Sequence, residues 1–163
     1  MRGPQIARPC PGFKRVRYFS GQVLSAADFM AEQEYLRGKQ KIHNRLLHGY
    51  GVVAGLETKV GGSTVTVSPG FALDRRGNEI VVDCPVELTL PREGRSVFVL
   101  LEYREKETDP IPTGDGMQAS RIEEGFRLAV QPGLSPDAVP VSKLARRSGR
   151  WRITRQFRVP RVR

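Results

Sequence analysis

Few side chains of this sequence are of the kinds that perform catalysis or hold metal ions. A nucleophilic serine or cysteine needs a nearby histidine as its base, and the chain has two histidines, His43 and His48. They lie five residues apart near the end of a predicted helix, so α-helical geometry points their rings to different sides and excludes a metal pair at i and i+4. We therefore expect both to be hydrogen-bonded structural residues.

The carboxylates and the cysteines predict no further site. Glu123 and Glu124 are sequence neighbours, and other candidates for paired acid–base work lie in a predicted exposed loop, where water solvates them. Cys10 and Cys84 have no C-x-x-C or Cys/His cluster near either, which predicts separate thiols rather than a zinc site or a disulfide framework. We expect no catalytic, cofactor-binding or metal-binding residue, and no enzyme.

The net charge of +10 is concentrated near the end of the sequence. Residues 146–163 hold eight arginines and no acid, whereas residues 1–145 carry 19 basic and 17 acidic groups. Such a tail binds nucleic-acid phosphates, docks on an acidic protein surface or keeps a protein in solution. Its aromatic residues are only Trp151 and Phe157, and it lacks the recognisable module of specific nucleic-acid readers. Nucleic acid is therefore possible as a partner but not favoured.

The composition of the 163 residues, 39% hydrophobic and 27% charged, is typical of one globular domain. No window approaches the roughly 20 consecutive apolar residues that cross a bilayer, and the start has no apolar run of signal-peptide length. We expect neither membrane insertion nor export, but synthesis and assembly in the cytoplasm.

A helix is predicted from Ser25 to about His48. Ser25 is a suitable N-cap, and Asp28 follows it three residues later, near the positive end of the helix. Gly49 and Gly51 supply the C-terminal stop. The sequence does not decide which face of this helix is buried, because two stripes share the heptad spacing. One is Phe29, Leu36, His43 and Tyr50, and the other is Tyr35 and Ile42.

Polar residues lie on or beside the first of these stripes, at Gln33, Gln40 and His43. Such residues set register where helices of neighbouring subunits pack, as polar residues do in coiled coils. They are also found on the half-exposed flank of a single domain helix. Periodicity alone favours neither interpretation.

Beyond Gly51 the hydrophobic period changes from helical to alternating. Strands are predicted over residues 52–60, 63–68, 71–74, 79–82, 86–90, 96–104, 126–131, 139–144 and 151–154. Residues 105–121 carry proline, glycine and charge without periodicity, which predicts a long exposed loop. One long N-terminal helix packed on an antiparallel β-sandwich or roll of short strands is an α+β fold.

The chain is thus expected to consist of three parts. Residues 1–17 form an extended N-terminal arm, residues 18–145 a single helix-plus-β domain, and residues 146–163 a basic tail that is partly strand. The arm and the tail are suited to strand addition onto a neighbouring subunit.

Several stretches together resemble a bacterial family of small proteins associated with phage-tail-like contractile injection systems. The resemblance rests on residues 17–24, 28–29, 32–33, 35, 41, 43–49, 51–53, 67–74, 77–80, 102–103, 108–112 and 120–126. The order of a helix, G-V-V-x-G-L, x-V-x-V-x-P-G-x-A, G-x-x-I-x-V and an apolar strand ending in E-Y is also similar to N-terminal attachment domains of phage tail fibre and baseplate proteins.

The resemblance implies a non-enzymatic structural component of a contractile injection particle: an adaptor, a plug or a baseplate/fibre-attachment protein. Because the sequence ends at Arg163 without a shaft or receptor-binding tip, we expect an adaptor, plug or baseplate-fitting role rather than receptor binding. Its partners would be baseplate, tube, sheath or fibre proteins and other copies of itself. The alternative is a nucleic-acid-binding module that acts through residues 146–163. The predicted interface residues are Gln33, Gln40, His43 and Asn44 on the helix, and Arg150, Arg152, Arg155 and Arg158 in the tail.

Overall fold

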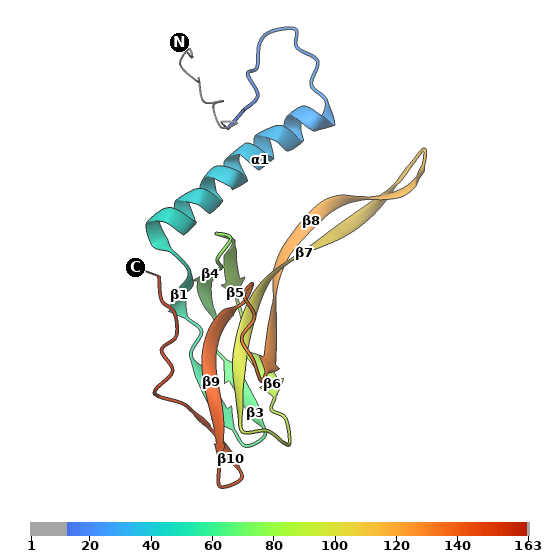
Figure 1. Cartoon of the computed structure of the whole chain (residues 1–163). Helices are drawn as coiled ribbons and strands as arrows, with labels where there is room; N and C mark the ends of the chain where they lie inside the picture. The colour runs from blue at the N-terminus through green and yellow to red at the C-terminus, as the bar shows by residue number, and fades with distance from the viewer. Residues whose placement is uncertain (1–12, 163) are drawn as a thin grey trace, which may run out of the picture. The chain divides into compact units, whose positions relative to one another are not determined.

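The computed structural model describes residues 13–162, which form one helix and ten strands (Figure 1). In chain order these are α1 (Ala26–His43), the π-helical turn η1 (Asn44–His48), β1 (Gly51–Gly55), β2 (Thr58–Gly61), β3 (Thr64–Val67), β4 (Gly70–Leu73), β5 (Glu79–Val82), β6 (Val86–Thr89), β7 (Ser96–Thr113), β8 (Gly116–Gln131), β9 (Val139–Arg147) and β10 (Arg150–Ile153). The contacts of the chain define two compact units, divided between Gln40 and Lys41.

The first unit contains most of α1, and the helix begins where the sequence predicts. The Asp28 carboxylate accepts hydrogen bonds from the N–H and the hydroxyl of Ser25, at 2.8 and 2.7 Å. These contacts satisfy groups that the first helical turn leaves unpaired. Phe13 lies edge-on to Tyr35, with 6.3 Å between the ring centroids. None of the residues of α1 is buried.

The second unit is built from three antiparallel sheets. Their strand orders are β1-β4-β5, β2-β3-β6 and β10-β9-β7-β8. The four-stranded sheet is layered on the other two: β8 contacts β5 and β6, β9 contacts β1, and β10 contacts β2. The α+β class is therefore confirmed, with its strands arranged as an antiparallel sandwich.

The core lies between these layers and follows the alternation of the strands. In β3, Val65 and Val67 are fully buried, while Thr64 and Thr66, which alternate with them, are partly exposed. In the central strand β7, Val97, Val99 and Leu101 point into the same core. Trp151 closes it at the β10 edge and donates its Nε1–H to the carbonyl of Pro91 at 3.2 Å.

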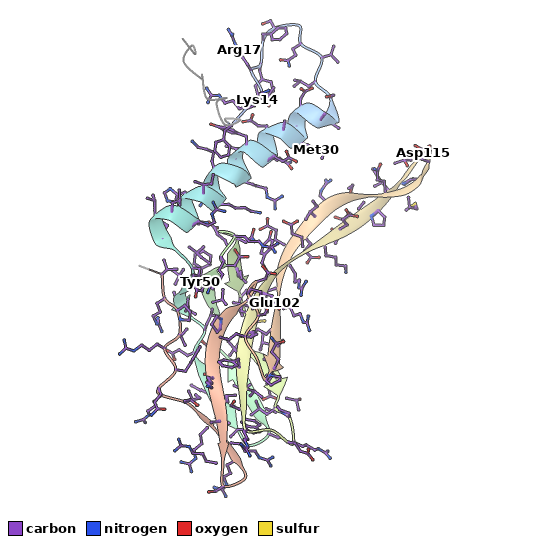
Figure 2. The ribbon with its side chains drawn as sticks, viewed as in Figure 1. Lys14, Arg17, Met30, Tyr50, Glu102 and Asp115 are labelled. Carbon is purple, nitrogen blue, oxygen red and sulfur yellow. The ribbon has the colours of Figure 1, made fainter. Side chains whose placement is uncertain are left out.

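The predicted loop over residues 105–121 is wrong, because this segment forms a long β-hairpin arm. Beyond Leu101, β7 pairs only with β8 among the described residues, and Gly114 and Asp115 make the turn. Figure 1 shows the arm extending from the sheet, and Figure 2 places Asp115 at its tip and Glu102 toward its base. At about 3.3 Å per residue, residues 102–113 reach about 40 Å.

The arm carries no apolar alternation because water solvates both of its faces. Nearly all of its side chains beyond Glu102 are exposed. The strands are joined by an antiparallel ladder that runs from Phe98↔Gln131 to Thr113↔Gly116. A pattern search for buried faces finds no strand in such a ribbon, since backbone pairing does not require one hydrophobic face.

The end of the described chain returns to β1. The N–H of Val52 donates to the Pro160 carbonyl at 2.8 Å, and the N–H of Val162 donates to the Val52 carbonyl at 3.2 Å. Gly51 permits this approach, because a Cβ there would lie 2.4 Å from the Pro160 oxygen. The predicted strand in the tail is confirmed as β10. The predicted N-terminal arm lies mostly outside the described residues, and Phe13–Arg17 form no helix or strand.

Candidate interaction surfaces

A cluster of arginines covers the β9–β10 hairpin and the segment after it. Antiparallel pairing sets Arg147 opposite Arg150, and Arg152 follows two positions along β10 on the same side of the strand. Arg147, Arg152 and Arg155 line a hollow of about 270 Å³. Arg147, Arg150 and Arg152 line a second hollow of about 460 Å³. We call Arg147, Arg150, Arg152 and Arg155 the basic hairpin surface.

The basic hairpin surface has no acidic partner within the described part of the chain. In residues 13–162 no carboxylate forms an ion pair with any of its four guanidinium groups. Thr154 lines the smaller hollow, and its Oγ1 is buried without a hydrogen-bond partner in the described structure. Unpaired guanidinium groups beside an unsatisfied hydroxyl are suited to carboxylates or phosphates.

Three of the four predicted tail residues therefore come together, and one does not. Arg150, Arg152 and Arg155 belong to the basic hairpin surface, whereas Arg158 lines neither hollow. The spacing of residues in the sequence did not identify Arg147 as a member of this cluster. Its position follows from the Ser148–Gly149 turn, which places it opposite Arg150 in the hairpin.

The β7–β8 hairpin arm is a second exposed surface. Ile111, Met117 and Ile122 are 50–68% exposed although their side chains are large and apolar. Pro110 and Pro112 alternate along β7, so the N–H groups that they lack would lie along one edge of the strand. This edge of β7 is therefore a poor template for strand addition.

Of the predicted helix residues, Gln33 and Gln40 are exposed on α1. Asn44 is not available to a partner, which corrects its assignment as an interface residue. It is only 4% exposed, and its Nδ2 donates to the carbonyl of Gly77 at 3.0 Å and to Oε1 of Glu79 at 3.1 Å. Asn44 thus fastens the π-helical turn η1 to the turn between β4 and β5.

The β4–β5 turn is itself closed by Asp74. Its carboxylate accepts the N–H groups of Arg76 and Asn78, each at 2.8 Å, and the Asn78 side-chain amide at 2.6 Å. Gly77 has φ +84°, and a Cβ there would lie 2.2 Å from the Lys41 carbonyl. Only glycine allows the turn to approach the chain this closely.

The two histidines also lie differently from the sequence prediction. We expected their rings to point to different sides, but Nε2 of His43 and Nε2 of His48 are 3.3 Å apart. The reason is the π-helical turn η1, closed by the hydrogen bond from the Gly49 N–H to the Asn44 carbonyl at 3.0 Å. A π turn advances five residues per hydrogen bond, so residues i and i+5 come to the same side.

Cys84 is exposed on the segment between β5 and β6. A hydrogen bond to Asp83 and the charge of that carboxylate raise the pKa of the Cys84 thiol above its ordinary value. A nucleophilic cysteine needs a lowered pKa. Within residues 13–162 there is no group of three or more His, Cys, Asp or Glu side chains that could hold a metal ion. In the same range, no helix combines the length and the apolar character needed to span a membrane.

No family model and no curated protein sequence matches the chain. Several solved structures do match the chain. A chain of the type VI secretion system TssK–TssF–TssG baseplate subcomplex has 15% identity and a TM-score of 0.60, covering 91% of this chain and 62% of that one. A chain of the baseplate complex from the type VI secretion system has 16% identity and a TM-score of 0.58, covering 91% and 60%.

The crystal structure of TssK matches in the same way, with 14% identity, a TM-score of 0.57, and coverage of 88% of this chain and 41% of that one. The fold is shared with baseplate proteins of a phage-tail-like contractile system. The resemblance that the sequence motifs indicated is thereby confirmed for the fold. The chain spans about three fifths or less of the length of these proteins.

Proposed function

We propose that this chain is a structural component of a contractile phage-tail-like injection particle, as an adaptor, a plug or a baseplate/fibre-attachment protein. One observation carries the proposal: the fold matches chains of two type VI secretion baseplate assemblies over 91% of the sequence. The role is non-enzymatic, and it rests on surfaces that bind other proteins of the particle and other copies of the chain.

The arm is the first of these surfaces. Ile111, Met117 and Ile122 are exposed on this arm, within about 40 Å of the sandwich as measured along the ribbon. Few other side chains cover them there. Apolar side chains that a partner desolvates supply most of the energy at the centre of an interface. The arm therefore inserts into, or lies along, a neighbouring particle protein.

The basic hairpin surface is the second. Guanidinium groups bind carboxylates with two parallel hydrogen bonds, which gives both energy and orientation. Arg150, Arg152 and Arg155, with Arg147 beside them, thus meet acidic or backbone acceptors of a particle partner. Arg158 remains a proposed contributor outside the hollows. On the helix, Gln33, Gln40 and His43 remain proposed contacts between copies.

A nucleic-acid-binding module is the second candidate function. The basic hairpin surface favours it, since its four arginines, which pair with no carboxylate in residues 13–162, line two hollows at the β9–β10 hairpin and the segment after it. Phosphate binding of this kind depends steeply on salt, because each contact releases counterions. The two candidates differ in whether the bound partner survives nuclease.

The experiment compares the tagged chain with Arg152→Glu/Arg155→Glu in its native host. Affinity purification with and without nuclease, followed by mass spectrometry, identifies the partners. We expect sheath, tube or baseplate proteins with the unaltered chain whether or not nuclease is added, and their loss with the double variant. Lys59→Glu, an exposed charge reversal on β2, is the control and should retain them.

Recovery of nucleic acid alone, with all partners lost after nuclease, would reject the structural proposal in favour of the second candidate. Partner recovery that is equal for the double variant and for Lys59→Glu would reject the basic hairpin surface as the contact.

A further inference from the structure

We propose that His43 and His48 form a binding site for a divalent transition-metal ion, of which Zn²⁺, Ni²⁺ and Cu²⁺ are the chemically suited ones. The two Nε2 atoms are 3.3 Å apart, the ring centroids 5.1 Å apart, and the ring planes inclined by 57°. Both residues are exposed, so the pair is open to ions in solution.

The spacing of the rings is that of two neighbouring ligands on one tetrahedral ion. Zinc–imidazole bonds are about 2.0–2.1 Å long, so two nitrogens at a tetrahedral angle lie about 3.3–3.4 Å apart. If both lone pairs point at the ion, the ring centroids are then about 5.1–5.3 Å apart. The observed 3.3 and 5.1 Å agree with both values. In the structure a hydrogen bond joins the two nitrogens, and a bound ion would take the place of its proton.

The backbone holds the histidines in this arrangement before any ion binds. His43 ends α1 and His48 ends η1, so the pair spans the π-helical turn. The Asn44 side chain fixes that turn to the carbonyl of Gly77, and the Gly49 N–H closes it on the Asn44 carbonyl. Preorganised ligands lose little conformational entropy on binding, which favours affinity.

Two histidines leave coordination positions open for water or another ligand. A hollow of about 320 Å³ adjoins His48 and is also lined by Arg45, Tyr50 and Arg161, among others. The two arginines lower the affinity for a bare divalent ion and favour an anionic co-ligand, such as a carboxylate, beside it. Imidazole prefers zinc, copper and nickel, whereas magnesium and calcium prefer oxygen ligands.

The test uses the full chain without a histidine tag, because His43 and His48 are its only histidines. Calorimetric titration with Zn²⁺ should show one ion per chain, and titration with Mg²⁺ should show none. Electron paramagnetic resonance of the Cu²⁺-loaded protein should show two equivalent imidazole nitrogens. His43→Gln and His48→Gln should each weaken Zn²⁺ binding by about 100-fold, because each removes one of two linked ligands.

Two control variants separate this site from other ligands. Cys84→Ser should leave Zn²⁺ binding unchanged. The double variant His48→Gln/Arg45→His keeps two histidines at a spacing that the π turn does not bring together, and it should bind as weakly as His48→Gln. Circular dichroism establishes that each variant folds.

Absence of Zn²⁺ binding by the unaltered chain at millimolar ion would overturn the proposal, as would binding unchanged in His43→Gln and His48→Gln. The titration needs no particle protein, so its outcome is independent of the proposed structural function.

Discussion

Asn44 is the residue whose substitution tests the structural account most sharply. Its amide joins η1 to the β4–β5 turn through two hydrogen bonds, to the buried Gly77 carbonyl and to the exposed Glu79 carboxylate. In Asn44→Ala the carbonyl of Gly77 loses this donor in a buried place, which costs about 1–2 kcal/mol. The lost bond to Glu79 adds about 0.5–1 kcal/mol, because water replaces it in part.

We therefore expect Asn44→Ala to lower the free energy of unfolding by about 1.5–3 kcal/mol. For a chain of this size the melting temperature should fall by about 3–12 °C. Urea unfolding measures the first quantity, and calorimetry the second. Amide exchange at Gly49, whose N–H closes the π turn, should become faster, since the anchor of that turn is lost.

Two further variants identify the physical cause. Asn44→Asp keeps the shape of the side chain but directs a negative charge at two oxygen acceptors, so it should destabilise at neutral pH at least as much as Asn44→Ala. Gln33→Ala, on the exposed part of α1, should change the free energy by less than about 0.5 kcal/mol. The reasoning is refuted if Asn44→Ala is as mild as Gln33→Ala, or if Asn44→Asp is fully tolerated.

Three other predictions concern the core, the arm and the helix cap. Leu101→Ala should cost about 2–5 kcal/mol in urea unfolding, and Val81→Ala, at a 62% exposed site, less than about 0.5 kcal/mol; equal losses would contradict the assigned core. Replacing residues 106–123 by a two-residue turn, which keeps Glu105 paired with Glu124, should change that free energy by less than about 1 kcal/mol, because two exposed strands add little stability; a large loss would show that the arm supports the sandwich. Hydrogen bonds from the hydroxyl and N–H of Ser25 hold the pKa of Asp28 below its ordinary 3.8, so the stabilisation by the cap is present above pH 3.8 and is lost as pH falls through the lowered pKa. Amide NMR shifts in the first turn of α1 should report this loss, and a shift profile unchanged in Asp28→Asn would contradict it.

Local signals in the sequence were sufficient for the elements whose cause is local. The cap formed by Ser25 and Asp28 is a contact three residues long, and it begins the helix where its pattern predicts. The alternation of residues 63–68 predicted a strand, and β3 over Thr64–Val67 confirms it. These features depend on residues that are neighbours in the chain.

Two predictions were wrong because backbone hydrogen bonds, rather than the pattern of side chains, determined the local structure. In the arm the hydrogen-bonded ladder needs no apolar face, so hydrophobic periodicity gave no signal. Gly114-Asp115 between two extended segments was the one local sign of a hairpin turn. At the end of α1, a π turn replaced the expected α-helical spacing and brought His43 beside His48. Propensity rules describe α-helices, and a single π turn has no sequence signature among them.

The predicted interface residues show the same difference between local and tertiary causes. Asn44 follows the polar stripe in sequence, yet its amide is used 33 residues away, at the carbonyl of Gly77. Arg147 and Arg150 come together through the register of a hairpin whose turn lies between them. Contacts of this kind depend on the tertiary fold, so they require the structure.

The central claim, that this chain is built into a contractile particle, is tested most directly by fractionation of the native host. Nuclease-treated extracts are sedimented, and the untagged chain is followed by antibody in the pellet and by immunogold labelling of the particles in negative stain. The account predicts that the chain sediments with sheath and tube proteins and labels the same site on each particle. A chain that stays in the supernatant while intact, unlabelled particles sediment would contradict it.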